Sequence, residues 1–137
     1  MVNPRHAAGL AAEDAVARWL TTAGWEVLER RWRVPEGELD LVCLDTVGCL
    51  VAVEVRMRTG DRTGSAVGSV DARRIGRLQR ALVRYARGTE LSGSALRVDL
   101  VTVTPDGTGG WRLSRNPDLG AEAAFSGRAS PRGRRPR

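Results

Sequence analysis

The sequence contains no lysine, so all 22 of its basic residues are arginine. Such a bias points to genome-wide composition, and an arginine at any one position is a weak sign that arginine is needed there. Five arginines and no acid lie in residues 126–137, which leaves 17 of the 22 basic residues against 16 acidic ones in residues 1–125. The net charge of +6 is therefore mainly a property of the tail, and does not by itself make the folded part a nucleic-acid binder.

Histidine, cysteine and aromatic residues are scarce. His6 is the only histidine, and Cys43 and Cys49 do not form a C-x-x-C motif. These counts argue against a Cys/His zinc site and against a histidine base, since His6 lies near the N-terminus. The cysteines are expected to be reduced thiols that pack as small apolar residues. With aromatic residues at 4% and no stacking ladder among them, sequence-specific recognition of a single strand is not expected.

The chain also lacks a long hydrophobic run, because its longest aliphatic stretch is Leu50–Val53. That excludes a transmembrane helix, and the charges of Glu13, Asp14 and Arg18 argue against a signal peptide in the first helix. A hydrophobic content of 42% with 28% charged residues is ordinary for a globular protein. We therefore expect a cytoplasmic protein with one domain over residues 1–125 and a disordered basic tail over 126–137.

Periodicity predicts an α/β fold in the order α-β-β-β-α-β-β, a mixed β-sheet flanked by helices. The strand at residues 25–32 is expected to have one wet face, and the strand at 50–56, the most apolar, to lie centrally. The segment 59–69 is rich in glycine and serine and predicts a mobile loop. The expected helices cover residues 6–23 and 71–87, and the expected strands 25–32, 38–44, 50–56, 96–104 and 111–114.

Three acids lie where the local pattern predicts apolar residues. Glu13 falls inside the apolar arc of the first helix, and Asp40 stands between Leu39 and Leu41, which simple alternation places together on the opposite face. Glu54 interrupts the buried strand 50–56, with Arg56 on its own face. One interpretation is a set of structural ion pairs, such as Glu54 with Arg56 or Glu13 with an arginine of the body. The other is a site for a hard divalent cation, Mg²⁺ or Mn²⁺.

The same residues carry a family resemblance. The combination of Gly9-x-x-x-Glu13, Gly37-Glu38-Leu39-Asp40-Leu41-Val42 and Val53-Glu54-Val55-Arg56-x-Arg58, with a weaker match at Ala124-Phe125, resembles the YraN-like family of uncharacterised bacterial proteins. That family looks like a branch of the PD-(D/E)XK nuclease-like superfamily and is similar to archaeal Holliday-junction resolvases. The resemblance covers about Gly9 to Val103.

The resemblance implies a restriction-endonuclease-like fold and a role in DNA repair or recombination. It implies that Asp40 and Glu54 ligate Mg²⁺ or Mn²⁺ and that Glu13 completes a catalytic acidic cluster. A metal in such a site acidifies a bound water and neutralises charge on the phosphate. The implied partner is nucleic acid, with DNA, including branched DNA, expected. A symmetric four-way junction would favour a homodimer.

The sequence departs from the superfamily at one position, where Glu-x-Lys becomes Glu54-x-Arg56. Arginine cannot act as a base, although its guanidinium can clamp a phosphate with two hydrogen bonds. Three functions therefore stay open. One is a metal-dependent nuclease in which Arg56 contacts the scissile phosphate. Another is a catalytically silent nucleic-acid-binding or adaptor module that keeps the fold. The third, with less support, is a protein-interaction module that uses the tail.

The helix at residues 71–87 carries a stripe of arginines at spacings of three and four residues. Its apolar face is expected to comprise Ile75, Leu78, Ala81, Leu82 and Tyr85. The stripe is either a solvated basic face or a row of phosphate contacts that positions a nucleic acid without reading its sequence. The nucleic-acid-binding candidates are Arg73, Arg77, Arg80 and Arg84 of this helix, together with Arg58.

Overall fold

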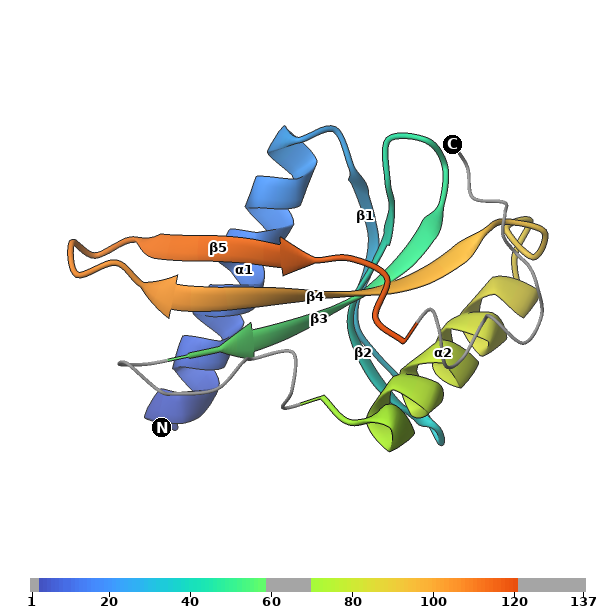
Figure 1. Ribbon diagram of the computed structural model, residues 1–137, viewed down its shortest axis with the longest axis horizontal. Coiled ribbons are helices and arrows are strands. Elements are labelled where there is room, and N and C mark those ends of the chain that lie inside the picture. The colour runs from blue at the N-terminus through green and yellow to red at the C-terminus, as the bar shows by residue number, and fades with distance from the viewer. Residues whose placement is uncertain (1–2, 59–69, 121–137) are drawn as a thin grey trace.

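The structure, a computed structural model, describes residues 3–58 and 70–120. The predicted order α-β-β-β-α-β-β is confirmed (Figure 1). The elements are α1 (Pro4–Thr22), β1 (Glu26–Val34), β2 (Gly37–Leu44), β3 (Leu50–Met57), α2 (Ala72–Arg87), β4 (Leu96–Pro105) and β5 (Trp111–Asn116). The predicted mobile loop at 59–69 and the predicted disordered tail at 126–137 lie outside the described residues.

The strands form a single mixed sheet in the order β1-β2-β3-β4-β5. Neighbouring strands are antiparallel except β3 and β4, which run parallel. The parallel pair follows from the chain, since a helix separates these two strands and carries the chain back to the other end of the sheet. Strand β3 lies at the centre, as its apolar composition predicted, and β5 forms one edge.

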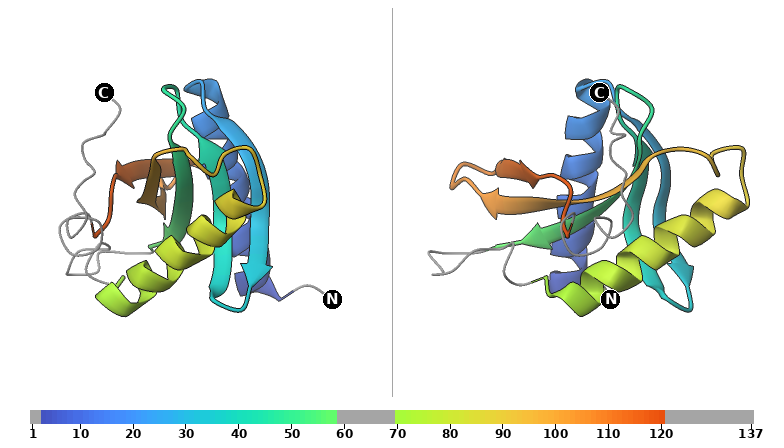
Figure 2. Two further views of the ribbon diagram at one scale, coloured as in Figure 1. Left: turned by 90° about the vertical axis from the view of Figure 1, so that its right-hand side faces the viewer. Right: turned by 45° about the vertical axis from the view of Figure 1, so that its right-hand side comes forward.

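The two helices cover opposite faces of the sheet (Figures 1 and 2). On the α1 face, Val16 and Leu20 belong to a cluster with Val53 of the central strand. On the α2 face, Leu78 and Leu82 belong to a cluster with Leu50 and Ala52 of the same central strand. No helix in the described ranges is long and apolar enough to span a membrane.

Helix α2 is amphipathic in the way its periodicity predicts. The Asp71 side chain caps its first turn and accepts a hydrogen bond from the Arg74 amide at 2.9 Å. Of the predicted apolar face, Leu78, Ala81 and Leu82 are buried, and the other two residues are partly buried against the same cluster. Arg73, Arg77, Arg80 and Arg84 of the stripe are all exposed.

Strand β1 is less regular than predicted. Its register against β2 shifts between Val27 and Glu29, and Arg31 has a positive φ of 55°. Val27 packs on the α1 face, whereas Leu28 and Trp32 pack on the α2 face. The prediction of a strand with one wet face is therefore wrong, because apolar residues stand at both odd and even positions of the strand and so pack on both faces.

Strand β2 also breaks its alternation, at Asp40. Leu39 belongs to the cluster on the α2 face and Leu41 to the cluster on the α1 face. The expectation that these two leucines share a face is therefore wrong. Between them, Asp40 interrupts the regular pleat at the end of the β2–β3 ladder.

Candidate functional site

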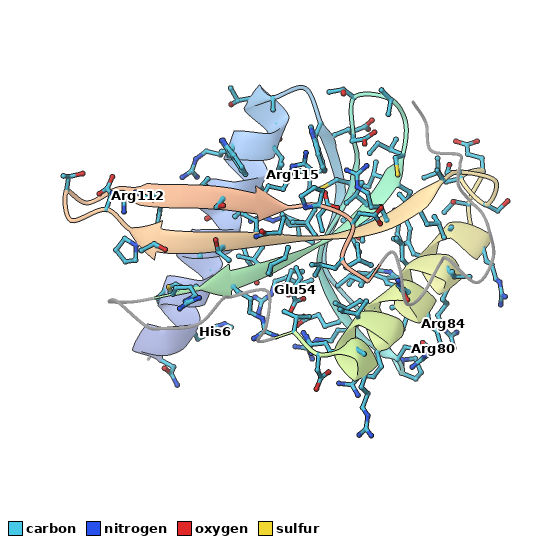
Figure 3. The ribbon with its side chains drawn as sticks, viewed as in Figure 1. His6, Glu54, Arg80, Arg84, Arg112 and Arg115 are labelled. Carbon is cyan, nitrogen blue, oxygen red and sulfur yellow. The ribbon has the colours of Figure 1, made fainter. Side chains whose placement is uncertain are left out.

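The carboxylate cluster has one member on each of three elements: Glu13 on α1, Asp40 on β2 and Glu54 on β3. The side chain of Glu54 is 3% exposed and that of Glu13 is 14% exposed. Glu54 lies on the α2 face, by alternation with Ala52, and Glu13 comes from the helix on the opposite face. Figure 3 shows Glu54 between the central strand and α2. Asp40 stands where the pleat changes and interacts electrostatically with both.

Asp40 lies just past the point where β2 and β3 stop pairing. The ladder ends at Leu41 opposite Val53, and the next amide available on β3, that of Val55, donates a hydrogen bond to Asp40 Oδ2 at 2.8 Å. A side chain thus satisfies a backbone group that the ladder has released. The hydrogen bond fixes the Asp40 carboxylate beside the central strand, one residue along from Glu54.

Burial, together with the neighbouring Glu54 carboxylate, raises the pKa of Asp40 to about 7. The Val55 amide opposes this rise, while Glu13 and Glu38 add to it. Within residues 3–58 and 70–120 no arginine forms an ion pair with Asp40. A buried carboxyl that faces other carboxylates and no cation is unfavourable unless something else compensates the charge.

Glu54 is held by two arginines through a single oxygen. Its Oε2 accepts from Arg74 Nη2 at 2.8 Å and from Arg74 Nε at 3.0 Å, and Arg56 Nε lies 3.3 Å away. Its other oxygen, Oε1, is buried and has no hydrogen-bond partner among the described groups. Half of this carboxylate is therefore still available as an acceptor.

Glu13 is similar. Arg31 Nε lies 3.6 Å from Glu13 Oε1, too far for a hydrogen bond, and in the described chain this buried oxygen has no other partner. Burial raises the pKa of Glu13, and the charge of Arg31 partly opposes the rise. Both ion pairs expected under the structural interpretation, Glu54 with Arg56 and Glu13 with an arginine of the body, are therefore formed. Neither satisfies its carboxylate fully.

Asp99 shows what a purely structural buried carboxylate looks like in this fold. It is completely buried, and both of its oxygens are bonded. Oδ1 accepts from Arg97 Nε at 2.8 Å and from the Asp118 amide at 2.9 Å, and Oδ2 accepts from Arg115 Nη1 at 2.8 Å. The unpaired oxygens of Glu13 and Glu54 are thus not a general feature of buried acids here.

The carboxylates do not form a ready-made metal site. In the part of the chain that the structure describes, no group of three or more Asp, Glu, His or Cys side chains is placed to hold a metal ion. The donor chemistry nevertheless fits a hard cation, because the buried unpaired atoms are carboxylate oxygens. A metal ion on Glu54 Oε1 would share the carboxylate with Arg56 and Arg74, whereas a metal ion on Oε2 would require the two arginines to release that oxygen.

The predicted nucleic-acid contacts lie on α2 and at the end of β3. Arg73, Arg77 and Arg80 are exposed and form no ion pair with the described residues. Arg84 is bonded to Glu36, from Nε to Oε1 at 3.0 Å and from Nη2 to Oε2 at 3.2 Å. Arg58 is partly exposed, and its amide donates to Val103 O at 2.9 Å. The stripe thus presents three arginines to solvent and one that is already paired.

Comparison with known proteins identifies the family. The uncharacterised protein family UPF0102 matches residues 12–103. The chain belongs to UPF0102. This is the YraN-like family that the motifs resembled.

Relatives within UPF0102 match most of the chain. A UPF0102 protein of Frankia casuarinae is 39% identical over 112 residues, covering 82% of this chain and 94% of the relative. One from Bordetella avium is 41% identical over 99 residues, covering 72% and 68%. One from Methylococcus capsulatus is 40% identical over 101 residues, covering 74% and 80%. All three carry only the family name, so they establish membership and not activity.

Among solved structures, SfsA of Pyrococcus furiosus in complex with Ca²⁺ is similar to this UPF0102 chain, with a TM-score of 0.36 and 13% sequence identity. The match covers 85% of this chain but 64% of the SfsA chain, less than two thirds of it. The Ca²⁺ belongs to SfsA, and the resemblance is too distant to assign a site here.

Two charged residues of the candidate site were not predicted from the sequence. Arg74 makes the shortest contact to Glu54, yet it was not grouped with the stripe because it lies about 100° from Arg73 on the helix. That angle falls within the apolar arc of α2, the same signal that singled out Glu13. Glu38 raises the pKa of both Glu13 and Asp40, and its placement two residues before Asp40 on one strand face was the available signal.

Proposed function

We propose that this UPF0102 protein is a metal-dependent, nuclease-like protein that binds nucleic acid and hydrolyses phosphodiesters. The expected nucleic acid is DNA, including branched DNA. The observation that carries the proposal is the incomplete compensation of the buried acids. Asp40 interacts with three other carboxylates and has no cationic partner in the described chain, and Glu13 and Glu54 each have an unpaired buried oxygen. Unfavourable burial of this kind is typical of functional sites.

In this proposal Asp40 and Glu54 hold Mg²⁺ or Mn²⁺, and Glu13 holds a metal-bound water or a second ion. The metal, when bound, supplies a more acidic water and positive charge for the phosphate. The residues of the chain position these groups: the Val55 amide fixes the Asp40 carboxylate, and Arg74 fixes one oxygen of Glu54.

The arginines bind and orient the substrate. Arg56 is one-third exposed beside Glu54 and has donors to spare for a phosphate oxygen. It does not serve as the base, because its guanidinium stays protonated. Contacts from Arg58 and from the stripe residues Arg73, Arg77, Arg80 and Arg84 would add affinity that depends on salt and not on sequence.

A second candidate function is a silent nucleic-acid-binding or adaptor module. It is favoured by the two arginines that already pair with Glu54 and by the absence of a ready-made metal-ligand group in the described residues. In such a protein the carboxylates would serve mainly to anchor Arg56 and Arg74 for phosphate binding.

Cleavage of a panel of labelled DNAs (single strand, duplex, flap and four-way junction) tests the proposal. We expect the wild type to cut at least one of them with Mg²⁺ or Mn²⁺ and none with EDTA, because the carboxylates need the cation to act on phosphate. Arg56→Lys is expected to keep or raise the activity. Binding without cleavage, with activity appearing only in Arg56→Lys, would support the silent module, and cleavage unaffected by EDTA would contradict a metal-dependent site.

A further inference from the structure

The sheet face that packs against α2 changes from apolar to polar partway along the parallel strands β3 and β4. The apolar half consists of four buried residues in the α2 cluster: Leu50, Ala52, Val98 and Leu100. Past these residues, toward the carboxyl ends of the strands, the same face continues with Glu54 and then with polar side chains. The carboxyl ends of neighbouring parallel strands are a common location of ligand sites.

The polar half extends across three strands, and we call it the hairpin face. It comprises Arg56 of β3, Thr102 and Thr104 of β4, and Arg112 and Ser114 of β5. Arg56, Thr102 and Ser114 are opposite one another in register and form one row, and Thr104 lies opposite Arg112 in the next. Adjacent strands are about 4.8 Å apart and residues two apart on a strand about 6.6 Å, so the five side chains form one continuous surface.

This polarity is specific to one face. On the opposite face the same strand ends carry Val55, Val103 and Leu113, which pack with the α1 cluster. If the strand ends were polar only because the hairpin projects beyond the core, both faces would be polar. The polar residues therefore line the face that the α1 cluster does not use, where they can meet water or a polar ligand.

The charge of the hairpin face is positive. Arg112 is exposed and has no ion pair with the described residues. The nearby Asp106 uses Oδ1 to accept from the Thr108 amide at 2.8 Å and the Gly110 amide at 3.1 Å, and its charge interacts with that of Arg112 without forming an ion pair. Glu54 is the acid at the inner border of the face, and Arg74 as well as Arg56 neutralises it.

Figure 3 shows Glu54 between Arg112 at the far end of the hairpin and Arg80 and Arg84 on α2. In this view a straight path from one basic region to the other crosses the position of Glu54. Arginines and hydroxyls are the side chains that most often bind the backbone of a nucleic acid. An extended polyanion with regularly spaced phosphates matches rows of such donors.

We propose that the hairpin face binds the sugar–phosphate backbone of a nucleic acid that runs from the Glu54 site toward the β4–β5 turn. The identity of the ligand rests on the proposed function, but the surface does not require that the site be catalytic. Arg112 and Arg56 would each contact a phosphate, with Thr104 and Ser114 as hydroxyl donors, whereas the Thr102 hydroxyl donates to Ser114 O at 3.5 Å.

The test measures binding of a labelled DNA duplex and of the matching single strand in EDTA, across a range of salt, so that no metal is needed. Arg112→Glu is expected to weaken binding of at least one of them about tenfold or more and to lower the salt slope by about one. Arg112→Gln should show a smaller loss in the same direction. The matched control is Arg18→Glu, which makes the same charge change on the exposed part of α1, across the sheet, and should leave affinity unchanged.

Equal losses in Arg112→Glu and Arg18→Glu would mean that net charge alone matters and would overturn the proposal, as would a wild type that binds neither DNA. A labelled polyglutamate peptide that binds as tightly as the DNAs, with the same loss in Arg112→Glu, would identify an acidic protein segment as the ligand instead. The outcome is independent of hydrolysis. A loss of binding in Arg112→Glu alone, without any cleavage by the wild type, would support the hairpin face as a binding surface and refute the nuclease. Cleavage by the wild type, with equal losses of binding in both variants, would support the nuclease and refute the hairpin face.

Discussion

Glu54→Gln is expected to lower metal-dependent cleavage at least about a hundredfold, or about 2.7 kcal/mol in the activation free energy. Glutamine has the same shape and keeps an oxygen that can accept from Arg56 and Arg74, but it removes the negative charge that a divalent cation needs. The measurement is the initial rate on the best DNA of the panel, with Mg²⁺ and with Mn²⁺.

The matched control for this variant is Glu36→Gln. Glu36 also pairs with an arginine of α2, Arg84, but it is part of an exposed ion pair away from the cluster. Its replacement is expected to leave cleavage within about twofold of the wild type, since exposed pairs contribute little. Full activity in Glu54→Gln, with an unchanged melting temperature, would exclude Glu54 from the reaction.

Asp40→Asn is expected to stabilise the protein in EDTA at pH 8. In the folded chain the pKa of Asp40 is raised to about 7, whereas in the unfolded chain it is about 3.9. Because the folded state holds the proton more tightly, the free energy of unfolding of the wild type decreases as pH rises from about 4 to about 7 and stays low above that range. Asparagine is neutral throughout and can still accept from the Val55 amide.

A pKa shift of this size corresponds to a change of about 4 kcal/mol at most in the free energy of unfolding. Solvent near Asp40 and the interaction with Glu54 make the change smaller. We expect about 2 kcal/mol at pH 8, or about 5–10 °C in melting temperature, and little difference near pH 4. Asp45→Asn is the contrasting variant. Asp45 lies 3.0 Å from Arg97 in an ion pair, so its replacement should destabilise the protein at pH 8. A comparable loss of stability in Asp40→Asn would show that Asp40 is a structural residue.

The sequence predicted the element order, the central strand and the three carboxylates, because these follow from periodicity and from its violations. Glu13 and Glu54 were found as charges at apolar positions, and both are largely buried. The same rule applied to α2 would have found Arg74. The exposed arginines form a stripe on another side of the helix, so Arg74 does not belong to that pattern.

The surroundings of Asp40 could not be predicted from alternation. A regular strand places Leu39 and Leu41 on one face, but the structure separates them. The break occurs where the β2–β3 ladder ends and the Val55 amide turns to a side chain. The positive φ of Arg31, which lies near Glu13, is likewise a feature of tertiary packing. No local pattern in the sequence specifies either irregularity.

The most direct test of a divalent-metal site is the melting temperature as Mn²⁺ is added, measured for the wild type, Asp40→Asn and Asp45→Asn. An ion that binds only the folded state raises stability by about 2.7 kcal/mol at a hundred times its dissociation constant. We expect a concentration-dependent rise in the wild type and in Asp45→Asn, and none in Asp40→Asn. No rise in the wild type, or the same rise in all three proteins, would contradict a metal site at Asp40.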